Sequence, residues 1–231
     1  MSADDMRTKL AQSPEAAAAL IAAGARSGLA EAQAAYGQIL LDGRGVRRDP
    51  EAAVRWFGAA AKAGHAMAAN MVGRCYEKGW GVAEDRTVAA AWYRAAAEAG
   101  LDWGMYNYGS ALGLGAGVAK DEVAALGWFR KAAAIGHAKS INFVGDYHEE
   151  GRLVPRDMRQ AAECYRLAAE GGDFRGQFNH ARMLADAGRV EEARMWLMRA
   201  NETCSEAFRE VMRGYFAGSA HEILRRIASQ L

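Results

Sequence analysis

The sequence predicts an all-α fold, a solenoid of stacked helical hairpins. Two observations lead to this prediction: one unit recurs every 36 residues, and alanine is abundant while proline is limited to three residues. Self-similarity at a fixed period is typical of repeat architectures, and the composition favours helix almost throughout. The 231 residues are enough for an array with a continuous core. We expect about eleven or twelve helices and no separate domains.

The repeat is most visible at its turns. The stretch DGRGVRRDP, with two glycines and three arginines before a helix-like run, could by itself be a phosphate-binding loop. A phosphate loop would occur once, whereas the first glycine of this turn recurs every 36 residues, as Gly43, Gly79, Gly115 and Gly151. The second glycine recurs as Gly45, Gly81 and Gly117, with Leu153 in the fourth copy. The stretch is therefore a structural turn between two helices.

The residues that flank the turn predict where the helices begin and end. An aspartate follows each turn at the expected N-cap position, as Asp49, Asp85, Asp121 and Asp157. Pro50 stands at the first helical position, which proline favours. A glycine ends each second helix, at Gly64, Gly100, Gly136 and Gly172.

Each hairpin repeats its apolar residues in register. In the second helix, Ala53, Trp56 and Ala60 form one stripe, and Trp92, Trp128 and Cys164 take the place of Trp56 in the later copies. We expect these tryptophans, Trp92 for example, to be buried between units. The first helix carries a fixed glycine at Gly37, Gly73, Gly109 and Gly145, which predicts a close helix–helix contact.

These residues resemble the Sel1-like repeat, a relative of the tetratricopeptide repeat. The segments MYNYG (105–109) and WYRAAAEAG (92–100) match its pattern especially well, and the resemblance covers residues 29–172. It implies a right-handed α-solenoid of helix-turn-helix units. We expect an N-terminal capping helix, or half repeat, in residues 1–28 and four repeats of 36 residues in 29–172. A shortened tetratricopeptide-like repeat would follow in 173–201, and C-terminal capping helices in 202–231.

Charge and hydropathy argue against several classes of partner. The formal net charge is +1, which indicates no attraction to nucleic acid or to an anionic membrane surface. The longest apolar run, AAAALIAAGA, is too short to span a bilayer. The first residues lack the layout of a signal peptide. We therefore expect a cytoplasmic, bacterial protein without membrane insertion.

The sequence contains no motif that indicates catalysis. Neither a Walker loop, a dinucleotide fingerprint nor a G-x-S-x-G elbow occurs, so we expect no catalytic, cofactor-binding or metal site. A metal-assisted hydrolase that uses His148 and neighbouring carboxylates is the weaker alternative, because no H-E-x-x-H pattern follows. The cluster of Asp146, Glu149 and Glu150 could be a binding patch, but a solvated helix face is favoured.

The resemblance implies a scaffold that binds a protein or peptide partner in a concave groove lined by the first helices. The predicted groove residues are Asn70, Arg74, Trp103, Tyr106, Asn142, Asp146 and Arg182. Trp103 is favoured over Tyr106 as the anchor, because the family pattern itself has a tyrosine at the second position. Asn70, Arg74 and Asn142 are expected to flank this pair. The alternative function is a toxin-neutralising (immunity) or secretion-linked adaptor.

Overall fold

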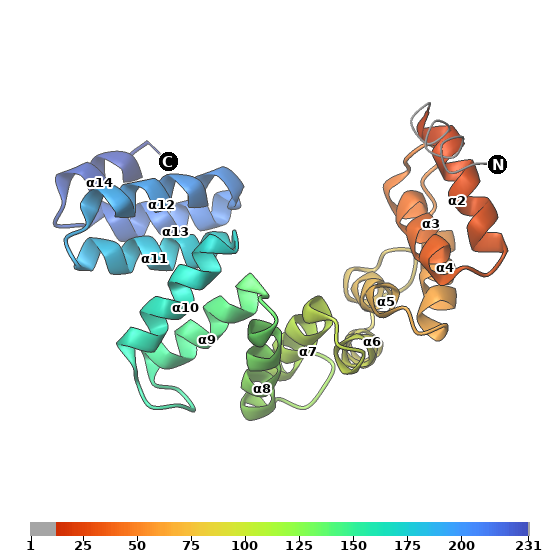
Figure 1. Ribbon diagram of the computed structural model, residues 1–231, viewed down its shortest axis with the longest axis horizontal. Helices are drawn as coiled ribbons and strands as arrows, with labels where there is room; N and C mark the ends of the chain where they lie inside the picture. The colour runs from red at the N-terminus through yellow and green to blue at the C-terminus, as the bar shows by residue number, and fades with distance from the viewer. Residues whose placement is uncertain (1–12, 231) are drawn as a thin grey trace. The chain divides into compact units, whose positions relative to one another are not determined.

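The computed structural model describes residues 13–230, and every regular element in this range is an α-helix (Figure 1). The thirteen helices are α2 (Pro14–Arg26), α3 (Ala30–Asp42), α4 (Pro50–Lys62), α5 (Ala66–Lys78), α6 (Arg86–Glu98), α7 (Asp102–Leu114), α8 (Glu122–Ala134), α9 (Ala138–Glu150), α10 (Met158–Glu170), α11 (Phe174–Asp186), α12 (Val190–Thr203), α13 (Glu206–Ala217) and α14 (Glu222–Ala228). The predicted all-α solenoid is confirmed. The helices outnumber the eleven or twelve expected. The first twelve residues of the expected N-terminal cap lie outside the described range.

The chain forms two compact units, which divide within α8, between Ala125 and Leu126. Residues 13–125 contain the capping helix α2, the helices α3 to α7 and the start of α8. Residues 126–230 contain the rest of α8 and the helices α9 to α14. The repeat pattern gives no sign of this division, because its period continues unchanged through α8. None of the helices in residues 13–230 is long and apolar enough to cross a bilayer.

The turns and caps lie where the sequence predicts them. Gly43 adopts a left-handed conformation with φ of 73° and ends α3, and its N–H donates to the carbonyl of Ile39 at 2.8 Å. The carboxylate of Asp49 then caps α4 by accepting the N–H of Ala52 at 2.9 Å. A Cβ on Gly45 would lie 2.2 Å from the carbonyl oxygen of Pro14, so this glycine allows the turn after α3 to pack on the start of α2. Leu153 keeps the left-handed conformation, with φ of 61°, although it has a side chain.

The prediction that the tryptophans are the buried aromatic residues is wrong by one position. Trp56, Trp92 and Trp128 are only partly buried. The residue that follows each one is 1–4% exposed, as Phe57, Tyr93, Phe129 and, after Cys164, Tyr165. The core stripe therefore runs i, i+4, i+7, since this spacing points the ring at the first helix of the same hairpin. Trp56 and Trp92 pack beside that stripe, around the core formed by α3, α4 and α5.

The fixed glycine of the first helix explains how close that ring comes. A Cβ on Gly37 would lie 2.8 Å from the ring of Phe57, and one on Gly73 would lie 2.6 Å from the ring of Tyr93. The aromatic ring thus lies directly over the glycine. The predicted close helix–helix contact is present at both positions.

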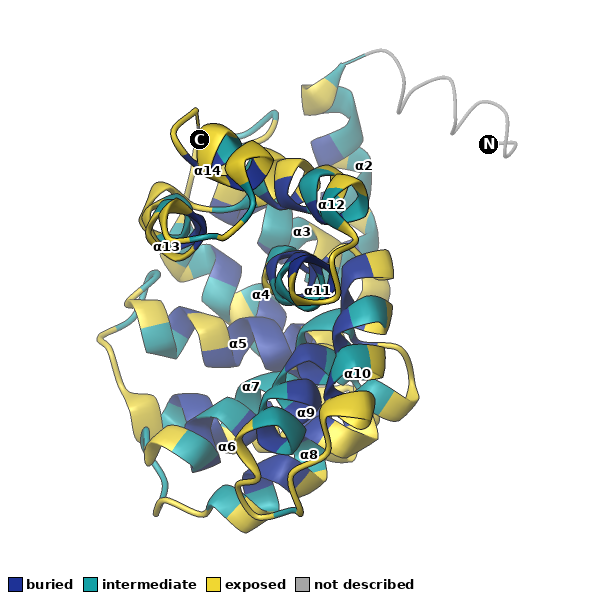
Figure 2. Ribbon diagram, turned by 90° about the vertical axis from the view of Figure 1, so that its left-hand side faces the viewer, coloured by how far each residue is buried: buried dark blue, intermediate teal, exposed yellow. Residues whose placement is uncertain are grey.

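The burial pattern changes toward the C-terminus. In Figure 2 the buried residues of α5 form a wide band, because α4, α6 and α7 all contact this helix. The helices α11, α12, α13 and α14 share a separate core, in which Leu197, Met212, Phe216 and Leu224 are at most 1% exposed. Three residues join α11 to α12, whereas seven join α3 to α4.

We predict opposite effects for alanine at two helical glycines. Gly73→Ala should lower the free energy of unfolding by about 1–3 kcal/mol, because the new methyl group overlaps the Tyr93 ring. Gly58→Ala is the matched control in α4, where nothing lies within 4 Å of the added Cβ. It should gain about 0.5–1 kcal/mol from the better helix propensity of alanine. Urea denaturation of both variants measures the difference, and a stabilised Gly73→Ala would contradict this packing.

Candidate functional site

The predicted site residues all come from the first helices of the hairpins. We call the surface formed by α3, α5 and α7 in residues 13–125, and by α9 and α11 in residues 126–230, the A-helix face of each unit. Neighbouring first helices contact one another, α5 with α7 and α9 with α11 (Figure 1). A residue of the A-helix face can therefore act together with residues of the next hairpin in the same unit.

Two of the predicted groove residues are buried. Asn70 is 3% exposed and Asn142 is 2% exposed. The side-chain carbonyl of Asn70 accepts a hydrogen bond from the amide of Asn107 at 2.8 Å, and that of Asn142 accepts one from Asn179 at 3.0 Å. Each pair satisfies buried polar groups between successive first helices. The structure thus places both asparagines in contacts between hairpins, which corrects the expectation that their side chains line an open groove.

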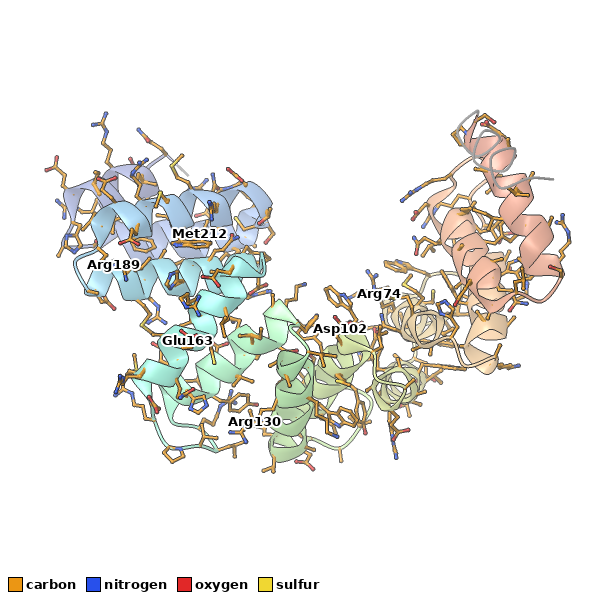
Figure 3. All side chains as sticks on the ribbon, viewed as in Figure 1. Arg74, Asp102, Arg130, Glu163, Arg189 and Met212 are labelled. Carbon is orange, nitrogen blue, oxygen red and sulfur yellow. The ribbon has the colours of Figure 1, made fainter. Side chains whose placement is uncertain are left out.

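In residues 13–125, Trp103, Tyr106 and Arg74 are the accessible members of the predicted set. Trp103 is 39% exposed at the start of α7, and its ring meets that of Tyr106 edge to face at 6.0 Å. Arg74, labelled in Figure 3, is exposed on α5, and its guanidinium lies 5.2 Å from the ring centre of Trp80. This part of the A-helix face offers aromatic and cationic groups together.

In residues 126–230, Asp146 and Arg182 belong to one polar network. Arg182 on α11 donates to both carboxylate oxygens of Glu149 on α9, at 2.7 and 2.5 Å. The hydroxyl of Tyr165 on α10 reaches Glu149 at 2.7 Å and Asp146 at 2.8 Å. Three helices are therefore joined by charge-assisted hydrogen bonds, which are stronger than those between neutral groups.

The network changes the proton affinity of its two carboxylates in opposite directions. Burial raises the pKa of Asp146 to about 6, against the lowering effect of the hydrogen bond from Tyr165. The hydrogen bonds from Arg182 hold the pKa of Glu149 below its usual value, although burial opposes them. Asp146 is thus the member of the network that gains a proton most readily below neutral pH.

The solvated helix face expected for the acidic cluster is only partly correct. Glu150 is exposed, but Asp146 and Glu149 are half-buried and hydrogen-bonded. Sequence reasoning missed Tyr165 as their partner. A signal was present: a glutamate four residues after the fixed glycine accompanies a tyrosine twenty residues after it, as Glu77 with Tyr93 and Glu149 with Tyr165. The other two hairpins have neither residue, with Leu41 and Phe57 in the first and Gly113 and Phe129 in the third.

The surroundings of His148 do not resemble a metal centre. Across residues 13–230, no three histidine, cysteine or acidic side chains come together in a group that could hold a metal ion. His148 is partly buried on α9, and His65 and His137 instead cap α5 and α9 through their Nδ1 atoms. The residues therefore do not fit the alternative of a metal-assisted hydrolase.

Comparison with protein families matches the Sel1 repeat to residues 30–65, 66–101, 104–137 and 138–173. Comparison with curated proteins gives no match. Among solved structures, a Sel1 repeat protein from Oxalobacter formigenes is 25% identical with a TM-score of 0.74, over 88% of this chain and 89% of that one. The protective antigen c5321 of uropathogenic Escherichia coli, with an SLR fold, has the same identity and TM-score over 94% of this chain and 48% of its own. The immunity protein Pa5087 from Pseudomonas aeruginosa is 17% identical with a TM-score of 0.56, over 87% and 80% of the two chains.

We predict that Asp146 makes stability depend on pH between about 4 and 6. Its pKa is raised in the folded protein, so the folded state holds the proton more tightly, and stability falls as pH rises through this window. Asp146→Asn cannot ionise and should exceed the wild type by about 1–2 kcal/mol at pH 8, allowing for partial solvent access. The two proteins should be equally stable at pH 4. Urea unfolding at both pH values measures this, and a difference that stays constant with pH would contradict it.

Proposed function

Because the chain belongs to the Sel1 repeat family, whose repeats generally mediate protein–protein interaction, we propose that it is a non-catalytic scaffold that binds a protein or peptide partner on its A-helix face. The observation that supports this proposal most strongly is Trp103, a large aromatic side chain that is 39% exposed on that face. Tryptophan, tyrosine and arginine are the residues most enriched at interaction hot spots. Trp103, Tyr106 and Arg74 supply all three on neighbouring first helices.

The variation between hairpins also supports this choice of face. The position of Trp103 is occupied by glutamate, methionine, lysine and arginine in the other hairpins, as Glu31, Met67, Lys139 and Arg175. The core positions, by contrast, keep alanine and an aromatic ring. Specificity for a partner can differ at positions that the fold does not constrain. The cytoplasmic location expected from the sequence stays a prediction.

A toxin-neutralising role would be a particular case of the same binding. The likeness to the Pseudomonas immunity protein concerns the fold alone at 17% identity. Identification of the partner separates the two functions: a captured protein that is toxic when expressed alone and harmless with this chain would establish neutralisation. A captured protein without toxicity would favour the general scaffold.

We predict that Trp103→Ala weakens partner binding while the protein stays folded. The ring is partly exposed, so the variant should keep its helicity and nearly its melting temperature. The affinity for the partner captured by the wild type should fall by about 2 kcal/mol, or roughly 30-fold. Calorimetric titration with that partner measures the change.

Met195→Ala is the control for this prediction, because Met195 is 51% exposed on the second helix α12. It should bind as the wild type does. Unchanged affinity in a folded Trp103→Ala variant would contradict binding on the A-helix face at this position.

A further inference from the structure

We propose that a pocket between α5, α6 and α7 binds an arginine side chain of the partner, with its guanidinium on the carboxylate of Glu77 and beside the hydroxyl of Tyr93. This inference rests on the proposed function and specifies the chemistry of the partner that the A-helix face recognises.

The pocket has a volume of about 300 Å³ and is partly open to solvent. The residues that line it include Glu77 on α5, Arg86 and Tyr93 on α6, and Asn107 and Ser110 on α7. The volume is at the lower end of the range for ligand pockets. It is large enough for one arginine side chain.

The chain itself contains a filled version of this arrangement. Each of the three central residues has an equivalent 72 residues later: Glu149 for Glu77, Tyr165 for Tyr93 and Arg182 for Ser110. In that second copy, the guanidinium of Arg182 donates to both oxygens of Glu149, and it lies 5.9 Å from the ring centre of Tyr165. The first copy keeps the glutamate and the tyrosine but has the short side chain of Ser110 where the arginine would be. In our proposal the partner supplies a guanidinium at the place that Arg182 takes in the second copy.

The receptor groups are already positioned for this ligand. The hydroxyl of Tyr93 donates to Oε2 of Glu77 at 2.5 Å, as that of Tyr165 does to Glu149 at 2.7 Å. Burial alone would raise the pKa of Glu77, but the hydrogen bond from Tyr93 and the charges of Lys78 and Arg74 lower it. Glu77 is consequently ionised at neutral pH, and a planar guanidinium fits a carboxylate in two-point contact.

Three cations of the chain compete with the ligand. The charge of Arg74 lowers the pKa of Glu77, and its guanidinium lies 5.2 Å from the ring centre of Trp80. Lys78 lies 3.0 Å from Oε1 of Glu77, but its side chain is 52% exposed, and exposed ion pairs of this kind are weak. Arg86, which also lines the pocket, is exposed, and its charge repels an incoming cation. Arg86 also defines the opposite possibility, a carboxylate ligand, which the experiment must distinguish.

The first experiment is an NMR titration of the full chain with N-acetyl-arginine amide. We expect saturable shifts of the backbone amides of Asn107 and Ser110, with a dissociation constant in the millimolar range typical of such a small contact. Glu77→Gln should weaken binding at least fivefold, and Arg86→Ala should strengthen it. The uncharged citrulline analogue should give no saturable shift at these amides.

The second experiment exchanges the residues that distinguish the two copies. Ser110→Arg should fill the pocket from within, remove binding of N-acetyl-arginine amide there and raise the melting temperature. Arg182→Ser should open a second site, seen as new shifts around Glu149 and Tyr165. Thr203→Arg is the matched control, because it adds the same side chain at an exposed position of α12 outside the pocket lining, and it should bind the probe as the wild type does. Circular dichroism of each variant confirms that it is folded.

The inference is overturned if the wild type shows no saturable shift at Asn107 and Ser110, or if Glu77→Gln binds as well as the wild type. It is also overturned if N-acetylglycine, which carries a carboxylate and no cation, binds there in preference to the arginine probe. Each of these results leaves the Trp103 experiment unaffected. The proposed function can also fail separately. If the partner does not bind on the A-helix face, its affinity for Trp103→Ala will equal that for the wild type, even when N-acetyl-arginine amide binds at Glu77.

Discussion

The contact between an aromatic ring of the second helix and a glycine of the first is the constraint on which each hairpin depends. At Gly37 and Gly73 the ring of Phe57 or Tyr93 occupies the space that a Cβ would need. This contact fixes both the distance between the two helices and their rotation about their axes. The rotation of the first helix then decides which of the positions three and four residues from the glycine face the core and which face the surface. The whole A-helix face is therefore positioned by a residue that has no side chain.

The same contact explains where the polar chemistry of the protein lies. Two hairpins place a tyrosine over the glycine, and its hydroxyl extends past the core to a glutamate on the first helix, Glu77 or Glu149. A buried hydroxyl needs a hydrogen-bond partner, so the tyrosine and the glutamate occur together. Where phenylalanine replaces tyrosine, no such partner is required, and leucine or glycine stands at the position of the glutamate.

The sequence predicted the repeat, the turns and the caps correctly because these depend on local chemistry. Gly43 and Asp49 each act within a few residues of their own position. The choice between Trp56 and Phe57 as the core ring was wrong, since both residues are large and apolar and only the rotation of the helix separates them. The burial of Asn70 and Asn142 was missed for a related reason: their partners, Asn107 and Asn179, are 37 residues away. A pattern that compares equivalent positions, 36 apart, does not pair them.

The hydrogen bonds between hairpins show that two periods coexist in this chain. The apolar core repeats every 36 residues, but the polar pairs repeat every 72, as Asn70–Asn107 and Asn142–Asn179 show. The histidine caps follow the longer period too, with His65 and His137 in alternate hairpins. Hairpins of two kinds therefore alternate from α5 to α11. Loss of a single hairpin would keep the pattern of core residues but leave amide and carboxylate groups without the partners that the neighbouring hairpin supplies.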